Sequence, residues 1–395
     1  MPSPIADAQA YLQTSGEADA WLLYDYRGVN PVFWDLMGGL NREVRPGMVT
    51  RPVFLLIPTR GEPVLLAHAV DAGKFAVLAV QMGVFAKREE MVARLGRLLR
   101  GRQRVAMEYS PAAALPRVSR VDAGTVELVR SLGVEVVSSA DLLQYATQRW
   151  SPVHLASHRS AAEKLGAIVQ EAFAWIGEHL AERPTEHQVA ELIRTLYREK
   201  GLETDEGPIV AVNAHASDPH FEPSEQNASA IVPGDWVLLD LWAREKGEDA
   251  MQADITWCGY VGSQAPPRHL AVFHAVLDAR DAAVDALQRA HQAGRILQGW
   301  EVDRVARELI TQRGYGDSFT HRLGHSLGRE VHANAVNLDD WETHDTRHII
   351  PGIAFTIEPG VYLPDFGVRS EIDLFMSVEG PVVTSPVQHQ VVLIG

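Results

Sequence analysis

Four carboxylates of this chain lie in segments that are rich in apolar residues. They are Asp240 in WVLLDLWA, Asp254 in MQADITWC, Glu358 in IAFTIEPG and Glu371 in VRSEIDLF. A near-continuous apolar run of this kind predicts a strand that is buried on both faces. Burying an unpaired carboxylate costs several kcal/mol, or forces the group to stay protonated, unless a cation or hydrogen-bond donors meet it. We therefore expect each of these acids to have a specific partner.

The order of the acids along the chain favours a divalent metal as that partner. Asp240 and Asp254 fall on consecutive predicted strands, and so do Glu358 and Glu371. Each pair is expected to face across an antiparallel ladder, where opposed side chains come within about 5 Å. Four converging carboxylates repel one another unless metal balances their charge, and four exceed the need of one ion, which predicts two. Oxygen-rich ligation with a single histidine favours Mn²⁺, with Zn²⁺ or Co²⁺ as alternatives.

The segment Thr320-HRLGHSLGREVH-Ala333 lies between the two acid pairs and holds three histidines, His321, His325 and His332. Its letters GHSLG also match G-x-S-x-G, the nucleophile elbow of serine hydrolases, with Ser326 as the nucleophile. An elbow requires a buried strand that runs into the serine, whereas the preceding residues DSFTHRLGH are mostly polar. The histidines favour a metal site, and the glycines of the segment are expected to let the backbone pass close to the metals.

Elements that could position these residues follow two patterns. Up to about residue 147 the runs AWLLY, PVFLLIP, PVLLAHA, RVAMEYS and VEVVSS are typical of strands, and EEMVARLGRLLRG is typical of a helix between them. This alternation predicts a small α/β domain over residues 1–150. Ser151 and Pro152 then suit the cap and first turn of a new helix, so a second domain is expected over residues 151–395.

The second domain repeats one order of elements. Predicted helices near 152–182 and 185–200 precede the strands PIVAVN, WVLLDLWA and MQADITWC. Predicted helices near 267–294 and 301–313 then precede IAFTIEPGVYL and VRSEIDLFMSV. We infer an α+β domain with two pseudo-symmetric halves from this repeated order, since the letters of the halves are hardly similar. Each half then supplies one acid pair.

Composition excludes several classes of protein. Of the 395 residues, 46% are hydrophobic and 22% charged, which excludes a disordered chain, and a net charge of −15 argues against nucleic acid as a partner. No apolar run approaches the roughly 20 residues of a membrane helix, and the N-terminus does not have the pattern of a signal peptide. These features predict a cytoplasmic protein without a membrane partner. The single cysteine, Cys258, is interpreted as a small buried hydrophobe.

Five motifs together resemble those of the pita-bread metallopeptidases, the family that includes prolidase (Xaa-Pro dipeptidase) and aminopeptidase P. They are LLDLWA, ADITW, HRLGHSLGREVH, TIEPGVY and GVRSEID, in the family's order and at close to its spacing. The resemblance covers roughly residues 152–395 and implies a pita-bread catalytic domain. Residues 1–150 match the family's creatinase/prolidase-like N-terminal domain only in length and α/β character. By analogy, that domain would help to form a homodimer that admits only short peptides.

The resemblance implies a role for each matching acid and for one histidine. Asp240 would chelate one metal ion, and Asp254 and Glu371 would bridge both. His325 and Glu358 would complete the other ion's ligands. A water or hydroxide held between the ions would attack the peptide bond before proline, and Glu358 would carry a proton to the leaving amine.

Four further residues match family positions around the substrate. His332 resembles the histidine that steadies the scissile carbonyl and the tetrahedral intermediate. His220 in DPHFEPS resembles the histidine that closes over the bound peptide, and His321 and Arg369 resemble residues that orient ligands and engage substrate. The implied substrate is a proline-containing dipeptide or short peptide. Xaa-Pro dipeptidase and aminopeptidase P stay open as alternatives.

Some positions depart from the family's pattern. The letters LWA follow Asp240, where a small residue and a glycine are usual, and Trp257 stands where arginine is usual. Ala333 replaces an acid that often follows the last histidine, and the acids around Glu371 are spaced rather than adjacent. None of these changes removes a ligand. They leave the shape of the substrate pocket open.

Other activities on the same fold are alternatives to the peptidase. Creatine-type relatives hydrolyse a C–N bond without metal and have changed ligand positions, whereas all five ligands are present here. A metal-using non-peptidase such as a lyase, a serine hydrolase that uses Ser326 and a binding protein without catalysis remain as rivals. The complete ligand set favours a metal-dependent peptidase.

Overall fold

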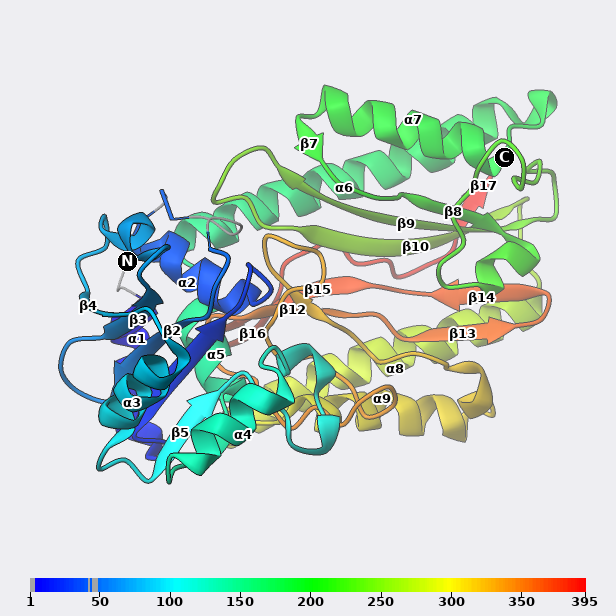
Figure 1. Cartoon of the computed structure of the whole chain (residues 1–395). Coiled ribbons are helices and arrows are strands. Elements are labelled where there is room, and N and C mark those ends of the chain that lie inside the picture. Colours follow the sequence, from blue (N-terminus) through cyan, green and yellow to red (C-terminus); the bar gives the residue numbers. More distant parts are fainter. Residues whose placement is uncertain (1–3, 42, 45–48) are drawn as a thin grey trace. The chain divides into compact units, whose positions relative to one another are not determined.

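The chain divides into two compact units between Arg149 and Trp150 (Figure 1). The computed structural model describes residues 4–41, 43–44 and 49–395. Unit 1 comprises residues 1–149 and unit 2 comprises residues 150–395. Separate hydrophobic cores lie within each unit. None of the described helices combines the length and the apolar character that a bilayer crossing requires.

Unit 1 is a mixed six-stranded sheet with helices on both faces, as the alternating apolar runs predict. The strand order is β4-β3-β2-β1-β5-β6. One core holds side chains of α1, α2 and α5, and the other holds side chains of α3 and α4. The elements are α1 (Pro4–Ser15), β1 (Ala20–Asp25), α2 (Pro31–Leu40), β2 (Val53–Pro58), β3 (Val64–His68), β4 (Gln81–Phe85), α3 (Arg88–Leu99), β5 (Arg104–Met107), α4 (Ala123–Ser131), β6 (Glu135–Ser138) and α5 (Ala140–Thr147).

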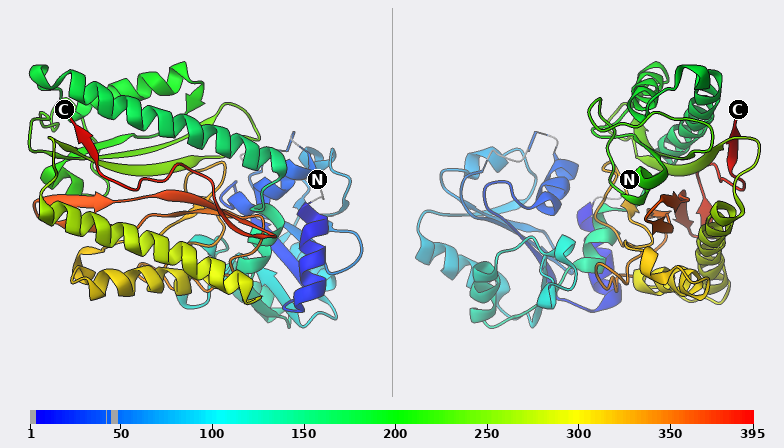
Figure 2. Two further views of the ribbon diagram at one scale, coloured as in Figure 1. Left: turned by 180° about the vertical axis from the view of Figure 1, so that it is seen from behind. Right: turned by 90° about the vertical axis from the view of Figure 1, so that its right-hand side faces the viewer.

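Unit 2 contains a five-stranded, a four-stranded and a two-stranded sheet, which lie between two pairs of helices (Figures 1 and 2). Its first half comprises α6 (Pro152–Glu178), α7 (Glu186–Glu199), β7 (Leu202–Glu203), β8 (Ile209–Val212), β9 (Trp236–Glu245) and β10 (Ala253–Val261). Its second half comprises α8 (Pro267–Gln292), α9 (Gly299–Gln312), β11 (Ser326–Leu327), β12 (Ala354–Ile357), β13 (Gly360–Leu363), β14 (Phe366–Arg369), β15 (Ile372–Ser377), β16 (Gly380–Val383) and β17 (Val392–Ile394). Helices α6 and α7 pack on the sheet of β9 and β10, and α8 and α9 lie on the side of the two sheets that β11–β16 form.

The first helix of unit 2 begins where its sequence predicts. The Ser151 hydroxyl accepts a hydrogen bond from the backbone N–H of His154 (3.3 Å), and the His154 side chain accepts from the Ser151 N–H (3.3 Å). Pro152 occupies the first turn, where no N–H is needed. Helix α6 ends at Glu178, and a separate 3₁₀ turn follows it, so the predicted continuation to residue 182 is not part of the α-helix.

The segments IAFTIEPGVYL and VRSEIDLFMSV each form two strands rather than the single strand that the sequence predicts. The breaks lie between Ile357 and Gly360 and between Arg369 and Ile372, although the antiparallel register continues across them. Pro359 has no N–H for a ladder. The Glu358 N–H donates to the Leu323 carbonyl (2.8 Å) and the Glu371 N–H to the Thr256 carbonyl (3.2 Å). These bonds to distant segments interrupt the ladder at the two acids.

Candidate metal centre

Asp240 and Asp254 come from the neighbouring strands β9 and β10. Val237, Leu239 and Leu241 of β9 pack in the core under α6 and α7, so by alternation Asp240 points to the opposite, inner face. The ladder pairs Asp240 with Thr256 and Asp254 with Trp242.

The prediction that the two aspartates directly oppose each other is therefore wrong. The register places Asp240 and Asp254 diagonally, two residues apart along β10, on the same face of the sheet. They are 7% and 4% exposed, respectively. The buried position that the apolar runs predict is thus confirmed, although the pairing is not.

Glu358 and Glu371 lie at the break of the second ladder. Ile357, the last residue of β12, pairs with Ile372, the first residue of β15, so the two glutamates occupy the next positions in the same register, outside the strands. A threonine holds each carboxylate. The Thr356 hydroxyl donates to Glu358 (3.2 Å), and the Thr256 hydroxyl donates to Glu371 (2.7 Å).

His325 is held by contacts of its backbone with β12. Its N–H donates to the Thr356 hydroxyl (3.0 Å), and the Thr356 N–H donates to its carbonyl (2.8 Å). A Cβ atom added at Gly324 would lie 2.0 Å from the Thr356 carbonyl oxygen. This glycine therefore permits a close approach to β12, and the expected approach of the backbone to the metals stays a prediction.

Helix α9 fixes the part of the same segment that precedes His325. Asp303 is fully buried, accepts a hydrogen bond from the Leu323 N–H (2.9 Å) and pairs with Arg307. The Arg307 guanidinium in turn donates to the carbonyls of Phe319 (2.9 Å) and His321 (2.8 Å). The histidine segment is thus anchored on both sides by polar contacts, which suits a rigid ligand.

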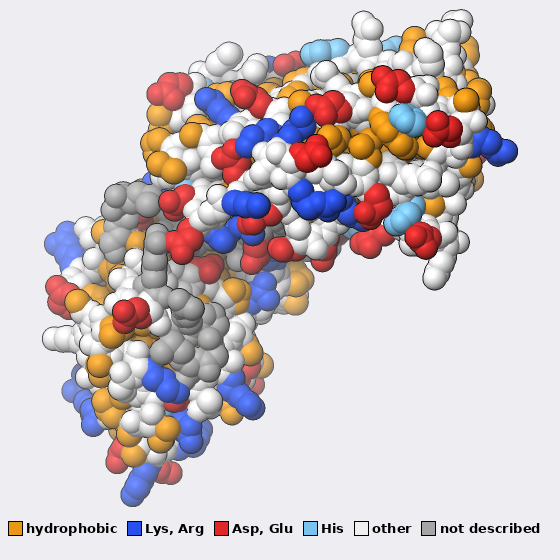
Figure 3. Space-filling view, turned by 90° about the horizontal axis from the view of Figure 1, so that it is seen from above, with side chains coloured by type: hydrophobic (Ala, Val, Ile, Leu, Met, Phe, Trp, Pro, Cys, Tyr) orange, Lys and Arg blue, Asp and Glu red, His pale blue; other side chains and the backbone are white. Residues whose placement is uncertain are grey.

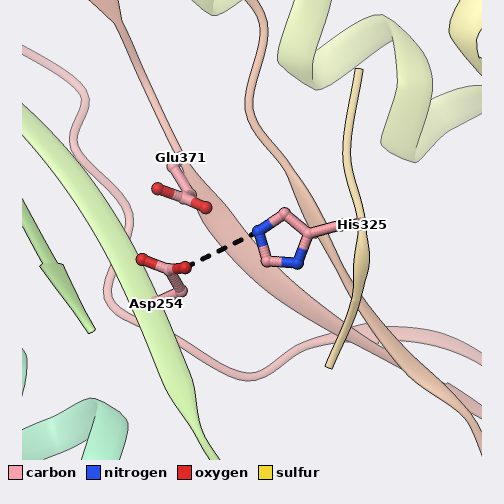
Figure 4. A group of neighbouring side chains, drawn as sticks. All are labelled: Asp254, His325 and Glu371. Atoms are coloured by element: carbon pink, nitrogen blue, oxygen red, sulfur yellow. Dashed lines mark ion pairs between the residues drawn. The ribbon is translucent and has the colours of Figure 1, made fainter. Parts of the chain in front are cut away.

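Three side chains from separate segments converge at the inner face. Ligand atoms of Asp254, His325 and Glu371 all lie within 4.8 Å of one another, and Figure 4 shows the three side chains directed toward a common point. The His325 Nε2 atom is 3.7 Å from Asp254 Oδ2 and 3.4 Å from Glu358 Oε1. Such a set of carboxylate and imidazole atoms suits a divalent ion.

Carboxylate oxygens without hydrogen-bond partners also indicate that this site suits a metal ion. Among the described residues, Asp240 Oδ1 and Asp254 Oδ1 are buried side-chain atoms without a hydrogen-bond partner. A buried carboxylate oxygen in that state costs free energy unless a cation meets it. The residues present therefore fit a metal ion.

Burial and mutual repulsion disfavour the charged form of these acids. Burial, followed by Glu371 and Asp240, raises the pKa of Asp254 well above its ordinary range. Burial, followed by Glu358 and Asp240, raises the pKa of Glu371 in the same way. Burial also raises the pKa of Glu358, to about 7. A divalent cation among them would reverse this balance, because it favours the ionised carboxylates.

Arg369 is the buried cation that contacts this group. It is 3% exposed and forms an ion pair with Asp240. Its other nitrogens donate to the Thr256 hydroxyl (3.1 Å) and to the Tyr362 hydroxyl (3.0 Å). Arg369 thereby fixes the orientation of Asp240.

His321 completes a chain of hydrogen bonds that starts at Arg369. Its Nδ1 lies 2.7 Å from the Arg322 carbonyl, which only accepts, so Nδ1 carries the proton. Nε2 then accepts from the Tyr362 hydroxyl at 2.7 Å. Burial and the nearby Arg369 lower the pKa of His321 to about 3, so the ring is neutral. His321 supports Tyr362 rather than a ligand.

A cavity of about 500 Å³ unites the predicted residues. His220 and His332 are exposed at it, and the rings of His332 and His325 lie 4.3 Å apart. The cavity is lined by all of the site residues that the sequence predicts, namely His220, Asp240, Asp254, His321, His325, His332, Glu358, Arg369 and Glu371.

The sequence did not predict several residues whose hydrogen bonds hold the site residues in place. Thr256, Thr356 and Tyr362 form hydrogen bonds with the predicted ligands or with Arg369, although each is of an ordinary type for a strand. Asp373 is fully buried and accepts from the Asp254 N–H (3.1 Å). Side chains alternate between the two faces of a strand, so Thr256 shares a face with Asp254. This alternation was the one signal in the sequence that could have identified Thr256.

The rival nucleophiles are buried. Ser326 is fully buried on the two-residue strand β11, and its hydroxyl accepts from the Ala335 N–H (3.1 Å). Cys258 is also fully buried, and burial raises the pKa of its thiol to about 12. The interpretation of Cys258 as a buried hydrophobe is confirmed, and Ser326 has no accessible hydroxyl for a serine-hydrolase reaction.

Comparisons with known proteins agree with this geometry. Residues 156–377 match metallopeptidase family M24. The Xaa-Pro dipeptidase of Pyrococcus furiosus is 31% identical over 223 residues, 55% of this chain and 58% of that protein. The Xaa-Pro dipeptidase of Lactobacillus delbrueckii is 31% identical over 217 residues, 54% of this chain and 53% of that protein. The matches thus span little more than half the length of these relatives.

The fold has a solved counterpart over nearly the whole chain. The dipeptidase PepE from Mycobacterium ulcerans superposes with a TM-score of 0.71 at 21% identity and covers 99% of this chain and 97% of that chain. This likeness shows the fold, an α/β domain followed by a pita-bread domain. The family match spans more than half of the chain and includes all five predicted ligands. The chain therefore belongs to metallopeptidase family M24.

Proposed function

We propose that this chain hydrolyses the bond between an N-terminal residue and proline in dipeptides or short peptides. The observation that carries the proposal is the convergence of Asp254, His325 and Glu371 in a cavity that Asp240 and Glu358 also line. The Xaa-Pro dipeptidases among its relatives support the choice of substrate.

Two divalent ions are part of the proposal, held by Asp240, Asp254, His325, Glu358 and Glu371. Mn²⁺ is favoured because oxygen ligands outnumber nitrogen ligands, with Zn²⁺ or Co²⁺ as alternatives. When bound, the metal supplies Lewis acidity and lowers the pKa of the attacking water.

Glu358 is proposed to pass a proton to the leaving amine. Its side chain is 14% exposed, compared with 6% for Asp254 and 9% for Asp240, so it is the ligand acid of these three with most access to the cavity. A carboxylate that receives a proton from the attacking water must also reach the substrate nitrogen. Its position satisfies both requirements better than the two aspartates do.

The exposed histidines are proposed to act on the substrate. His332 lies beside His325 and would donate a hydrogen bond to the scissile carbonyl oxygen as negative charge develops. His220 lies in the loop before β9 and would close over the peptide. Arg369 would keep Asp240 oriented, and His321 would keep Tyr362 and Arg369 in place.

A substrate panel tests the proposal. Protein reconstituted with Mn²⁺ is assayed against Xaa-Pro dipeptides, longer peptides that begin with Xaa-Pro, and matched Xaa-Ala controls. The expected result is cleavage of Xaa-Pro substrates alone, and the length preference decides between a dipeptidase and an aminopeptidase. Equal cleavage of the Xaa-Ala controls, or no cleavage of any peptide, contradicts the proposal.

A cytoplasmic homodimer belongs to the same proposal, with residues 1–150 as a creatinase/prolidase-like domain that supports it. The chain has a mass of 43.5 kDa. Sedimentation equilibrium is expected to give twice this mass at micromolar concentration. A mass that stays at the monomer value over the whole concentration range contradicts the dimer.

A further inference from the structure

A second cavity lies next to the metal cavity. It has a volume of about 240 Å³ and shares Glu206, Trp242, Val331 and His332 with the larger cavity. Asp205 and Glu330 also line it. We call it the acidic side cavity, defined by Asp205, Glu206 and Glu330 around the shared Trp242 and His332.

The three acids of this cavity are exposed, and within the described parts of the chain none of them forms an ion pair. Acids close by are paired. Glu203 forms an ion pair with Arg244 (3.0 Å), and Glu342 at the metal cavity forms one with Arg322 (2.9 Å). Residues 150–395 carry 36 acidic and 19 basic residues. The side cavity therefore has negative charge that the protein itself does not neutralise.

Gln252 gives an independent indication of a ligand. It lines the side cavity and is 4% exposed, yet its Oε1 has no hydrogen-bond partner among the described residues. A buried amide oxygen without a donor costs about 1–3 kcal/mol. A ligand with N–H groups would remove this cost.

Trp242 gives the side cavity an aromatic wall. It lies on the inner face of β9, directly across from Asp254, and borders both cavities. The loop before β8 packs on its indole, since a Cβ atom added at Gly207 would lie 2.5 Å from the ring. An indole face attracts cations. Trp242 also occupies one of the positions at which the sequence departs from the family's pattern.

We infer that the acidic side cavity binds the positively charged side chain of the substrate's first residue, so that arginine or lysine is preferred before proline. This inference rests on the proposed function and specifies its substrate class. A guanidinium presents five N–H donors in one plane, which suits a carboxylate, the Gln252 oxygen and the indole face together. A neutral side chain of the same size leaves the negative charge of the three carboxylates unbalanced.

A pair of matched dipeptides tests the inference. Citrulline has nearly the shape of arginine but no charge, so Arg-Pro and Cit-Pro differ in the feature that the cavity would recognise. We expect kcat/KM to be about tenfold higher for Arg-Pro, the ratio that one charge-assisted hydrogen bond supplies. The double substitution Glu206→Gln and Glu330→Gln should reduce this ratio to about one or two.

The control is Glu222→Gln. Glu222 is an exposed acid that lines the metal cavity but not the side cavity, so the Arg-Pro to Cit-Pro ratio should stay at its wild-type value. A ratio near one in the wild type, or a ratio that survives the double substitution, overturns the inference. An equal loss for both dipeptides also overturns it, because the acids would then bind the α-ammonium group.

Binding separates this inference from the proposed function. If neither dipeptide is cleaved while both bind, the proposed function fails, and calorimetric affinities of the metal-free chain still test the cavity. Arg-Pro should then bind about tenfold more tightly than Cit-Pro, and the double substitution should remove the difference. Equal affinities in the wild type contradict the inference whatever the activity.

Discussion

Glu108 in unit 1 and Asp254 in unit 2 are both buried carboxylates, but their surroundings are opposite. Glu108 accepts hydrogen bonds from Trp21 Nε1 (2.6 Å), Asn30 Nδ2 (2.8 Å) and Ser139 Oγ (3.2 Å). Asp254 keeps one oxygen without a partner in the described structure and lies among other acids. Burial of an acid alone therefore does not distinguish a structural group from a functional one. The distinction comes from whether the protein itself supplies the partners.

Charge follows the same division between the units. Residues 1–149 carry 17 basic and 15 acidic residues, whereas residues 150–395 carry 19 basic and 36 acidic residues. On the face of unit 2 that Figure 3 shows, acidic and basic side chains are interspersed. Part of the excess lies in the cavities, where a bound cation is expected to balance it.

The largest effect is expected for Asp254→Asn. Loss of this carboxylate, which is proposed to bridge the two ions, should lower kcat/KM by about a thousandfold or more, because metal binding and water activation would depend on it. The melting temperature of the metal-free chain should stay equal or rise, since one of several repelling acids becomes neutral. Steady-state assays and calorimetry with a chelator measure both. A melting temperature of the metal-free variant below that of the metal-free wild type contradicts the contrast drawn between Asp254 and Glu108.

The second-largest effect is expected for Glu108, the buried acid whose hydrogen-bond partners the protein supplies. Glu108→Ala leaves the donors of Trp21 and Asn30 buried without an acceptor, which should destabilise unit 1 by about 3 kcal/mol. Urea unfolding measures the free energy, and elemental analysis should show an unchanged metal content. A loss of metal with retained stability would reverse the roles that we assign to the two acids.

The third effect is a pH dependence of unit 1. Burial raises the pKa of Glu108 from its ordinary 4.5 to about 7. The folded state then holds a proton that the unfolded state releases, so this contribution to stability is present below pH 4.5 and is lost as the pH rises through 7. The expected loss is about 3 kcal/mol. Unfolding as a function of pH measures it, and Glu108→Gln should remove the slope. An unchanged slope in that variant contradicts the assignment.

The smallest effect separates the two tryptophans of the β9–β10 hairpin. Trp257 packs with the core under α6 and α7, whereas Trp242 borders both cavities. Trp257→Phe should change kcat/KM by less than about twofold and stability by about 1 kcal/mol. Trp242→Leu should lower the preference for Arg-Pro over Cit-Pro severalfold. Equal behaviour of the two variants would remove the role of Trp242.

The sequence predicted the parts of the site that depend on local pattern. An acid inside an apolar run marked Asp240 and Asp254, and a cap marked the start of α6. The register of β9 and β10 was not predictable, because a two-residue offset leaves every side chain on its face. The ladder breaks at Glu358 and Glu371 depend on the Leu323 carbonyl and the Thr256 carbonyl, which are distant in sequence. The side cavity likewise joins four segments that are separate in the sequence, namely residues 204–206, Trp242, Gln252 and residues 330–332.

Metal stoichiometry tests the central claim most directly, namely that the unsatisfied carboxylates of unit 2 hold metal ions. The wild-type chain is loaded with Mn²⁺, freed of excess metal and analysed for metal per chain, beside Asp254→Asn and Glu108→Gln. We expect two ions in the wild type and in Glu108→Gln, and fewer than one in Asp254→Asn. Equal metal content in Asp254→Asn and the wild type, or none in the wild type, would contradict the account.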